Sequence, residues 1–240
     1  MEKLKIGALN LLKSKIMKKF NLLICCCILW SVNVLSQGKC SKFYPIKENA
    51  SFTLGVFDAS NVELGKMTYD VIEVIGDSAV YTVKMSLSGF PERVSQFEIS
   101  CTDAGVSMSF SAMSGGMSGG ANNAKITGNN IYLPNELSVG QTLPDAEMSM
   151  SSSSSPTRIN MSRKMYNRKI DRIETISAAG ESFICFVLTY DTIMTMSGGM
   201  NIRTKTEQFL AENVGTVKTM EYDGDGNLTG TTKLTSYRLN

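Results

Sequence analysis

Apolar and polar residues alternate along most of the chain after residue 40, so that every second side chain falls on one face. This period of two, with many β-branched residues, is typical of half-buried β-strands. The strands that the pattern predicts are 51–57, 66–75, 79–87, 95–101, 105–110, 125–133, 168–176, 182–196, 203–211, 215–223 and 227–239. No window of about a dozen residues in this part has the 3.6-residue period of a helix. We therefore predict an all-β fold, a curled antiparallel sheet in the form of a barrel-like roll or half-barrel.

Turn residues separate the predicted strands. Gly76-Asp77-Ser78 and the segment 102–105 are typical hairpin connections, and Asn129-Asn130 divides the strand segment 125–133. The segment 223–227 (DGDGN) begins like a calcium loop. It lacks the glycine and the glutamate that such a loop needs at its sixth and twelfth positions, so we interpret it as a hairpin turn.

Two parts of the chain have the same order of elements. Residues 68–110 and 171–223 each begin with a strand that carries Ile-Glu, and each continues through an apolar strand, a glutamate-bearing strand and a tight turn. Their identity is low, and chance similarity between hairpins is the simpler explanation. A true repeat predicts two half-sheets that curl toward each other around one core.

The N-terminal region has the pattern of a secretory signal peptide. A basic segment ends at Lys19, and an apolar run follows from 20 to 35, shorter than a membrane-spanning helix requires. We predict a signal-peptide helix in residues 1–36, cleavage between Ser36 and Gln37, and a single all-β domain over 37–240. Met1 and Met17 both remain candidates for the true start. The predicted location is the periplasm or the outside of the cell.

Removal of residues 1–36 changes the charge of the chain. The whole sequence has 24 Lys+Arg and 22 Asp+Glu; the leader contains six lysines and one glutamate, which leaves 18 basic and 21 acidic residues. The mature chain therefore has a net charge of 18 − 21 = −3 and no basic cluster. Nucleic acid is excluded as an expected partner, and no integral membrane segment is expected after cleavage.

Three cysteines remain after cleavage, namely Cys40, Cys101 and Cys185. Two of them can pair in an oxidising compartment, and the spacing does not select a pair. We favour Cys40–Cys101, because Cys40 could then fix a loose end to the sheet. The alternative is that Cys101 and Cys185 are small buried residues of strands.

Two low-complexity inserts interrupt the strands, at residues 111–124 and 149–157. Their Gly/Ser-rich composition predicts flexible segments.

Several segments resemble a known family. They are "CSKFYPIKENASFTL", "IYLPNELSVGQTLPDAEM", "IETISAAGESFICFVLTYD" and "EQFLAENVGTVKTMEYDGDGNL". Together they make the chain similar to the TapB-like family of secreted Gram-negative β-proteins of unknown function, over nearly all of residues 40–237. The resemblance implies an all-β curled sheet or roll in the periplasm. It implies no catalytic residues, because none are defined for the family.

The sequence offers few groups for catalysis. It contains no histidine, which removes His-based acid–base catalysis and ordinary zinc or non-haem iron sites. No cofactor or metal is expected. Four glutamates on predicted strands could include a glycosidase-like pair: Glu73, Glu98, Glu174 and Glu207. No complete set of catalytic roles can be assembled from them, so we expect a protein that is not an enzyme.

Methionine is the unusual feature of the composition. Of 15 methionines, 13 remain after Met1 and Met17 are removed. The candidates to line a ligand site are Met108, Met113, Met117, Met194, Met196 and Met200. Flexible thioethers suit an adaptable apolar cavity, which a curled sheet can enclose. We therefore predict binding of a lipid or another apolar molecule of the cell envelope. The alternatives are a copper(I) site of methionines, a carboxylate-based glycan hydrolase, and ordinary core packing.

Overall fold

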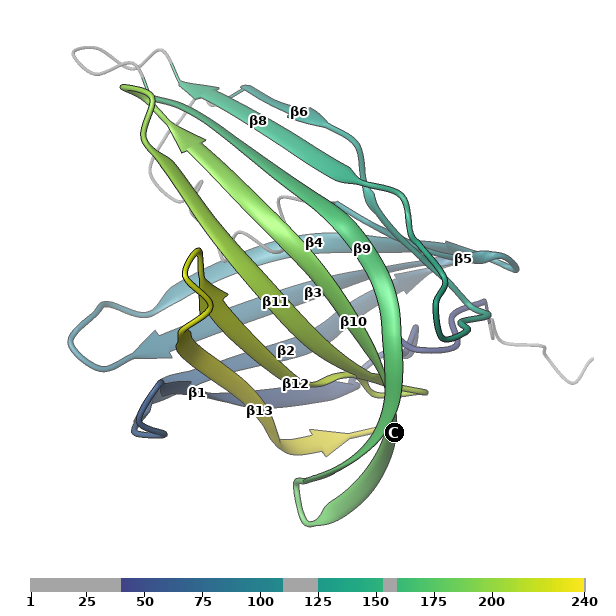
Figure 1. Ribbon diagram of the computed structural model, residues 1–240. Helices are drawn as coiled ribbons and strands as arrows, with labels where there is room; N and C mark the ends of the chain where they lie inside the picture. Colours follow the sequence, from purple (N-terminus) through teal and green to yellow (C-terminus); the bar gives the residue numbers. More distant parts are fainter. Residues whose placement is uncertain (1–39, 110–124, 153–158, 240) are drawn as a thin grey trace, which may run out of the picture. The chain divides into compact units, whose positions relative to one another are not determined.

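The computed structural model of the chain describes residues 40–109, 125–152 and 159–239, and the all-β prediction is confirmed. Figure 1 shows the strands as one strongly curved antiparallel sheet. The described ranges contain no helix with the length and hydropathy needed to cross a membrane. The strands are β1 (Ser51–Asp58), β2 (Glu63–Ile75), β3 (Ser78–Leu87), β4 (Arg93–Thr102), β5 (Gly105–Met108), β6 (Lys125–Gly128), β7 (Ile131–Pro134), β8 (Ala146–Ser152), β9 (Ile159–Ala178), β10 (Glu181–Met196), β11 (Asn201–Ala211), β12 (Gly215–Asp223) and β13 (Leu228–Arg238).

The order of the strands differs from a simple meander at its two edges. The order in the sheet is β6-β8-β9-β10-β11-β12-β13-β1-β2-β3-β4-β5-β7. Asn129-Asn130 therefore does not form the hairpin turn predicted within 125–133, because β6 pairs with β8 and β7 pairs with β5. These two asparagines instead connect the opposite edges of the sheet. The chain thus connects the two edge strands, β6 and β7, although these strands do not pair with each other.

The curl brings distant strands face to face. In Figure 1 the long strands β9, β10 and β11 cross in front of β2, β3 and β4. Arg168 on β9 donates a hydrogen bond of 3.0 Å to the carbonyl oxygen of Tyr132 on β7, although many strands separate β9 from β7 in the sheet. The two meanders with similar sequence order, β2–β5 and β9–β12, lie in these two halves. The concave side of the sheet carries most of the core.

One predicted insert belongs partly to the sheet. Ser149 to Ser152 are part of β8, which pairs along its whole length with β9. Met148 and Met150 are buried, whereas Ser149 and Ser151, which alternate with them, are exposed. The prediction of a flexible insert at 149–157 is therefore wrong for its first four residues. The rest of that insert (153–157) and all of the insert at 111–124 lie outside the described residues, as does the predicted signal peptide.

Residues 40–50 form a segment that fixes the start of the described chain to several strands. Cys40 is joined to Cys101 on β4 by a disulfide, with the two Cα atoms 5.6 Å apart, while Cys185 is a free, buried cysteine. The Asn135 side chain accepts a hydrogen bond from the Lys42 backbone N–H at 2.9 Å and donates one to the Cys40 carbonyl oxygen at 2.6 Å. The ring of Phe43 is 1 % exposed. We call residues 40–50 the N-terminal clamp.

Candidate functional site

A cavity of about 330 Å³ lies on the concave side of the sheet. Most of its wall is apolar or aromatic, and strands β1–β5 and β9–β13 all contribute residues to it. In antiparallel pairs, residues directly opposite each other share a face. The pairs Leu54–Met67 and Tyr81–Phe97 are directly opposite and both line the cavity. The cavity is therefore built by the register of the strands, and its volume falls in the range of small-molecule sites.

The N-terminal clamp covers the cavity near the turn between β11 and β12. Tyr44 and Pro45 are part of the wall, and the Tyr81 hydroxyl donates a hydrogen bond to the Pro45 carbonyl oxygen. The Tyr44 ring packs against Gly215, where an added Cβ would lie 2.9 Å from the ring. Only glycine permits this close approach, and its φ of 81° also favours glycine. The tight turn at Gly215 therefore lets the clamp close this end of the cavity.

Tyrosine hydroxyls give the wall isolated polar positions. Burial raises the pKa of Tyr69 to about 12 and the pKa of Tyr190 to about 12. Burial also raises the pKa of Tyr44 and Tyr81, so all four hydroxyls are protonated at neutral pH. The Tyr81 hydroxyl donates to the Pro45 carbonyl oxygen and the Tyr69 hydroxyl to the Met67 sulfur, so the Tyr44 and Tyr190 hydroxyls are the candidates to contact a ligand. Such sparse polar groups typically orient a ligand in an apolar pocket.

Arg168 is a buried cation in the wall of this cavity. Its side chain is 2 % exposed, and its terminal nitrogens donate hydrogen bonds to the carbonyl oxygens of Pro144 at 2.6 Å and Tyr132 at 3.0 Å. Its Nε has no hydrogen-bond partner, and no carboxylate among the described residues lies within ion-pair distance. Burial lowers the pKa of Arg168. The guanidinium therefore links the segments that carry Pro144 and Tyr132, while its positive charge lacks a neutralising anion.

A second pair of charged groups lines the cavity farther along the same strands. Arg163 on β9 is partly buried, and Glu221 on β12 is exposed. Glu221 lies directly opposite Thr206, which lies directly opposite Tyr190. Tyr190 and Thr206 are buried, and only the Glu221 end of this row is exposed to solvent. This end of the cavity therefore carries charged groups, whereas Tyr44, Gln208 and Thr216 at the clamped end are neutral.

The structure separates the methionines that the sequence suggested as ligand contacts. Met108 lines the cavity. Met194 is partly buried against the core, whereas Met196 and Met200 are 37 % and 57 % exposed and do not line this cavity. Met113 and Met117 lie outside the described residues. Three methionines that were not suggested, Met67, Met85 and Met165, contribute to the wall instead.

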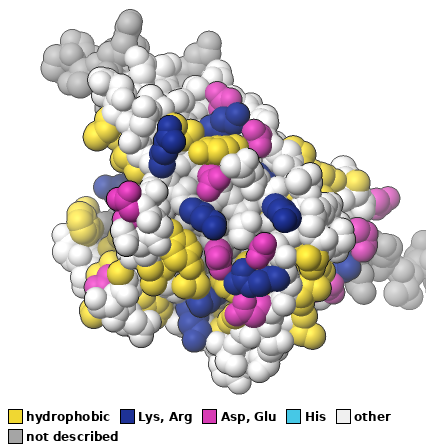
Figure 2. Space-filling model, in the orientation of Figure 1, with side chains coloured by type: hydrophobic (Ala, Val, Ile, Leu, Met, Phe, Trp, Pro, Cys, Tyr) yellow, Lys and Arg dark blue, Asp and Glu magenta, His cyan; other side chains and the backbone are white. Residues whose placement is uncertain are grey.

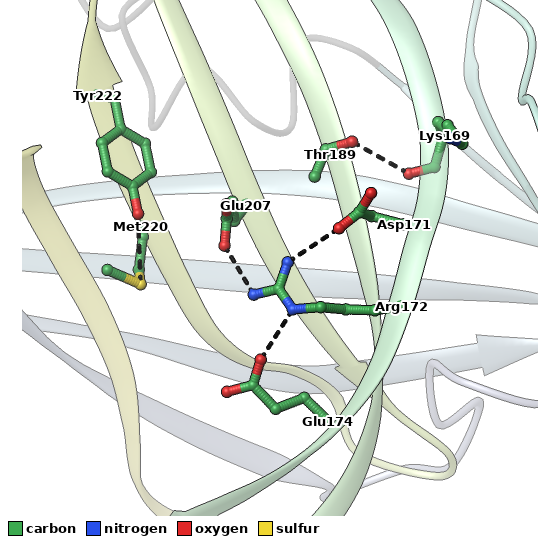
Figure 3. A network of polar contacts seen from close by, with 8 residues as sticks. All are labelled: Lys169, Asp171, Arg172, Glu174, Thr189, Glu207, Met220 and Tyr222. Carbon is green, nitrogen blue, oxygen red and sulfur yellow. Dashed lines mark hydrogen bonds and ion pairs between the residues drawn. The ribbon is translucent and has the colours of Figure 1, made fainter. Parts of the chain in front are cut away.

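Two of the candidate glutamates meet on the opposite face of the sheet (Figure 3). Arg172 bonds to Glu174 at 2.9 Å and to Glu207 at 3.0 Å, and Asp171 is a third carboxylate partner at 3.1 Å. Arg172 is opposite Val187, the neighbour in sequence of the cavity residue Leu188, so this cluster faces away from the cavity. Both carboxylates therefore bind one cation and do not flank a cleft.

The same outer face carries a mixed pattern of charge. Figure 2 shows basic and acidic side chains side by side over β9, β10 and β11. The Arg172 guanidinium lies 5.7 Å from the centre of the Phe209 ring, and Lys218 Nζ lies 5.2 Å from the same centre. Such contacts stabilise the sheet surface by cation–π attraction. Glu73 and Glu98 each lie opposite Val80 on exposed strand positions and do not join the cluster.

A family model described as DUF3108-like matches residues 47–234, which is most of the chain. The chain belongs to the DUF3108-like family. The match agrees with the resemblance to a family of unknown function, and it does not single out the TapB-like group. None of the curated proteins matches the sequence.

Two crystal structures share the fold of this DUF3108-like chain. One, provisionally described as an exported protein with a YmcC-like fold, is from Bacteroides fragilis; it has 17 % identity and a TM-score of 0.68, and the match covers 83 % of this chain and 100 % of that one. The other, provisionally described as a lipoprotein, is from Parabacteroides distasonis; it has 19 % identity and a TM-score of 0.68, with 84 % and 100 % covered. At these identities the likeness shows the fold alone.

Proposed function

We propose that this protein binds an amphipathic molecule without chemically changing it, with the apolar part of the ligand in the cavity on the concave side of the sheet. The cavity of about 330 Å³ with its aromatic and methionine-rich wall is the observation that carries this proposal. An apolar ligand in the cavity would gain dispersion contacts with the wall, and its apolar surface would be removed from water. The aromatic wall and the flexible Met67 and Met85 side chains suit ligands of variable shape.

The buried cation favours a ligand with an anionic group. Arg168 has no carboxylate within ion-pair distance among the described residues, and burial disfavours its charged form. A carboxylate or phosphate near Arg168 would offset this desolvation, and Arg163 is a second cation in the cavity wall. The Tyr44 and Tyr190 hydroxyls would contribute further hydrogen bonds. The proposed ligand class is therefore an acyl chain with an acidic end.

The first experiment measures uptake of a neutral apolar probe, the fluorophore N-phenylnaphthylamine. Thr232 lines the cavity, whereas its neighbour Thr231 points to the other face of the same strand. We expect saturable fluorescence enhancement with the wild type and with Thr231→Phe, and at least tenfold weaker binding by Thr232→Phe, whose ring would occupy the cavity. Equal binding by the two variants, or no enhancement with the wild type, would contradict an internal site.

The second experiment separates ligand charge from ligand apolarity. Laurate, dodecanol and dodecyltrimethylammonium share one alkyl chain and differ only in the end group. We expect laurate to displace the probe at lower concentration than dodecanol, and the cation to be the weakest competitor. An Arg163→Gln variant should reduce the preference for laurate. Equal displacement by all three would disprove the anionic preference and leave the apolar site standing.

The location of this binding is also a proposal. The signal-peptide pattern of residues 1–36 and the disulfide Cys40–Cys101 support an oxidising compartment such as the periplasm, and the descriptions of the two structural neighbours agree with export. We likewise retain membership of the TapB-like group as a proposal within the DUF3108-like family. N-terminal sequencing of the exported protein tests the cleavage after Ser36; a mature chain that retains residues 20–27 would contradict it.

A further inference from the structure

Three methionines lie in a row across three neighbouring strands. Met150 on β8 is directly opposite Met161 on β9, and Met161 is directly opposite Met196 on β10. Directly opposite residues of an antiparallel pair have Cβ atoms about 5 Å apart, so each thioether lies within reach of the next. We call these three residues the methionine row.

The methionine row lies on the concave face of the sheet. Met161 has the same strand parity as the cavity residues Arg163 and Met165. Met196 has the same parity as Tyr190 along β10, which pairs with β11 without a register shift. Side chains on a concave surface converge at their tips, which shortens the separation of the sulfur atoms. The sheet therefore brings three flexible thioethers toward one point.

Two of the three methionines in the row are buried, and the third is exposed to solvent. Met161 and Met150 are 7 % and 9 % exposed, whereas Met196 is 37 % exposed. The three residues line a hollow of about 440 Å³ together with hydroxyl- and amide-bearing residues of the same strands and of β6. A small ion could thus reach the row past Met196 and then be held by two buried sulfur atoms. An apolar core contact alone does not require three thioethers in register.

The chemistry of the row selects a soft cation. Thioether sulfur is a soft ligand that favours copper(I), and hard cations such as Mg²⁺ and Ca²⁺ prefer oxygen. Among the described residues, no cluster of three or more His, Cys, Asp or Glu side chains could compete for a metal ion. Arg163 on the same face lies opposite Met148 and Met194 rather than within the row.

We propose that Met150, Met161 and Met196 form a three-thioether site for copper(I), separate from the apolar cavity. The sequence offered copper(I) binding only as an alternative use of its methionines; the pairing register assigns it to three residues that the sheet places side by side. The site needs no redox step, because copper(I) binds as such and stays in that state in the presence of ascorbate. It does not rest on the proposed ligand cavity.

The test uses the full chain with its competing thiols removed. Cys25, Cys26 and Cys27 are replaced by serine and Cys185 by alanine, while the disulfide is kept, because ascorbate does not reduce it. Copper(I) is titrated against a colorimetric copper(I) chelator, and the methionine methyl groups are observed by carbon-13 NMR. We expect one copper(I) per chain and shifts of the Met150, Met161 and Met196 methyl signals.

Leucine variants and a matched control decide the outcome. Leucine is close to methionine in volume, so the substitutions keep the fold. Met150→Leu, Met161→Leu and Met196→Leu should each weaken copper(I) binding at least tenfold, and Met220→Leu, on another strand, should leave it unchanged. Binding that survives the triple variant, binding lost only on replacement of Met113 and Met117, or no binding by the starting protein would overturn the proposal. Probe uptake by the cavity should be unaffected in every case.

Discussion

The disulfide between Cys40 and Cys101 should stabilise the fold mainly by restricting the unfolded chain, and in the folded state it also joins the N-terminal clamp to β4. It joins residues 61 positions apart. Closing a loop of this length reduces the entropy of the unfolded chain and so raises its free energy by about 4 kcal/mol at room temperature. Reduction should therefore lower the free energy of unfolding by about 2–4 kcal/mol, since native-state adjustments usually reduce the full entropic value. The clamp retains its hydrogen bonds to Asn135, so the reduced protein should still fold.

The assay is urea unfolding with and without dithiothreitol, on the wild type and two variants. The double variant Cys40→Ser/Cys101→Ser should match the reduced wild type and should not respond to dithiothreitol. The Cys185→Ala variant should respond as the wild type does. Burial raises the pKa of the Cys185 thiol to about 11, so it should not exchange with the disulfide near neutral pH. An unchanged midpoint on reduction, or a Cys185→Ala variant that no longer responds, would refute this pairing.

Three further predictions concern single positions in the sheet. Gly215→Ala should destabilise the protein by about 1–3 kcal/mol more than Gly226→Ala in urea unfolding. The new Cβ at position 215 meets the Tyr44 ring at 2.9 Å, whereas nothing lies within 4 Å at Gly226. Equal losses of unfolding free energy in the two variants would show that the ring contact is unimportant. Ala179→Gly should raise the midpoint by an amount equivalent to about 1 kcal/mol, since Ala179 has a φ of 49° in the β9–β10 turn; a lower midpoint would contradict this. Tyr190 is 4 % exposed, and burial raises its pKa to about 12, above the unfolded value of about 10. Its contribution to the free energy of unfolding is therefore complete below pH 10 and is lost as the pH rises toward 12. Over that range the free energy of unfolding should fall less steeply in Tyr190→Phe than in the wild type, and parallel curves would contradict the burial of this hydroxyl.

The alternation of apolar and polar residues predicted most of the strands because one face of the sheet is buried. It failed where composition concealed the alternation. The segment 148–152 reads Met-Ser-Met-Ser-Ser, and its serine content suggested a flexible insert, although Met148 and Met150 follow the period of two and are buried. Serine on the outward face of a strand is compatible with pairing, so the apolar positions alone carried the structural signal.

The strand order and the site depended on information that is not local in the sequence. Asn129-Asn130 has the composition of a hairpin turn, but the edges of the curled sheet meet there, and no nearby residue signals this connection. Arg168 lies in a predicted strand next to a register shift between β9 and β10, which decides the face it occupies. A period of two cannot reveal such a shift, so the buried cation was not predicted. Among the candidate methionines, Met108 reached the cavity because its strand pairs beside Ile131 on the concave face.

The most direct test of the binding proposal is the carbon-13 methionine methyl NMR spectrum during a titration with laurate. Met67, Met85, Met108 and Met165 all line the cavity and come from different parts of the chain, whereas Met220 is not among its lining residues. We predict that these four signals shift together and saturate at one laurate per chain, while the Met220 signal stays unchanged. Unchanged cavity signals, or shifts that affect Met220 equally and do not saturate, would contradict an enclosed binding site.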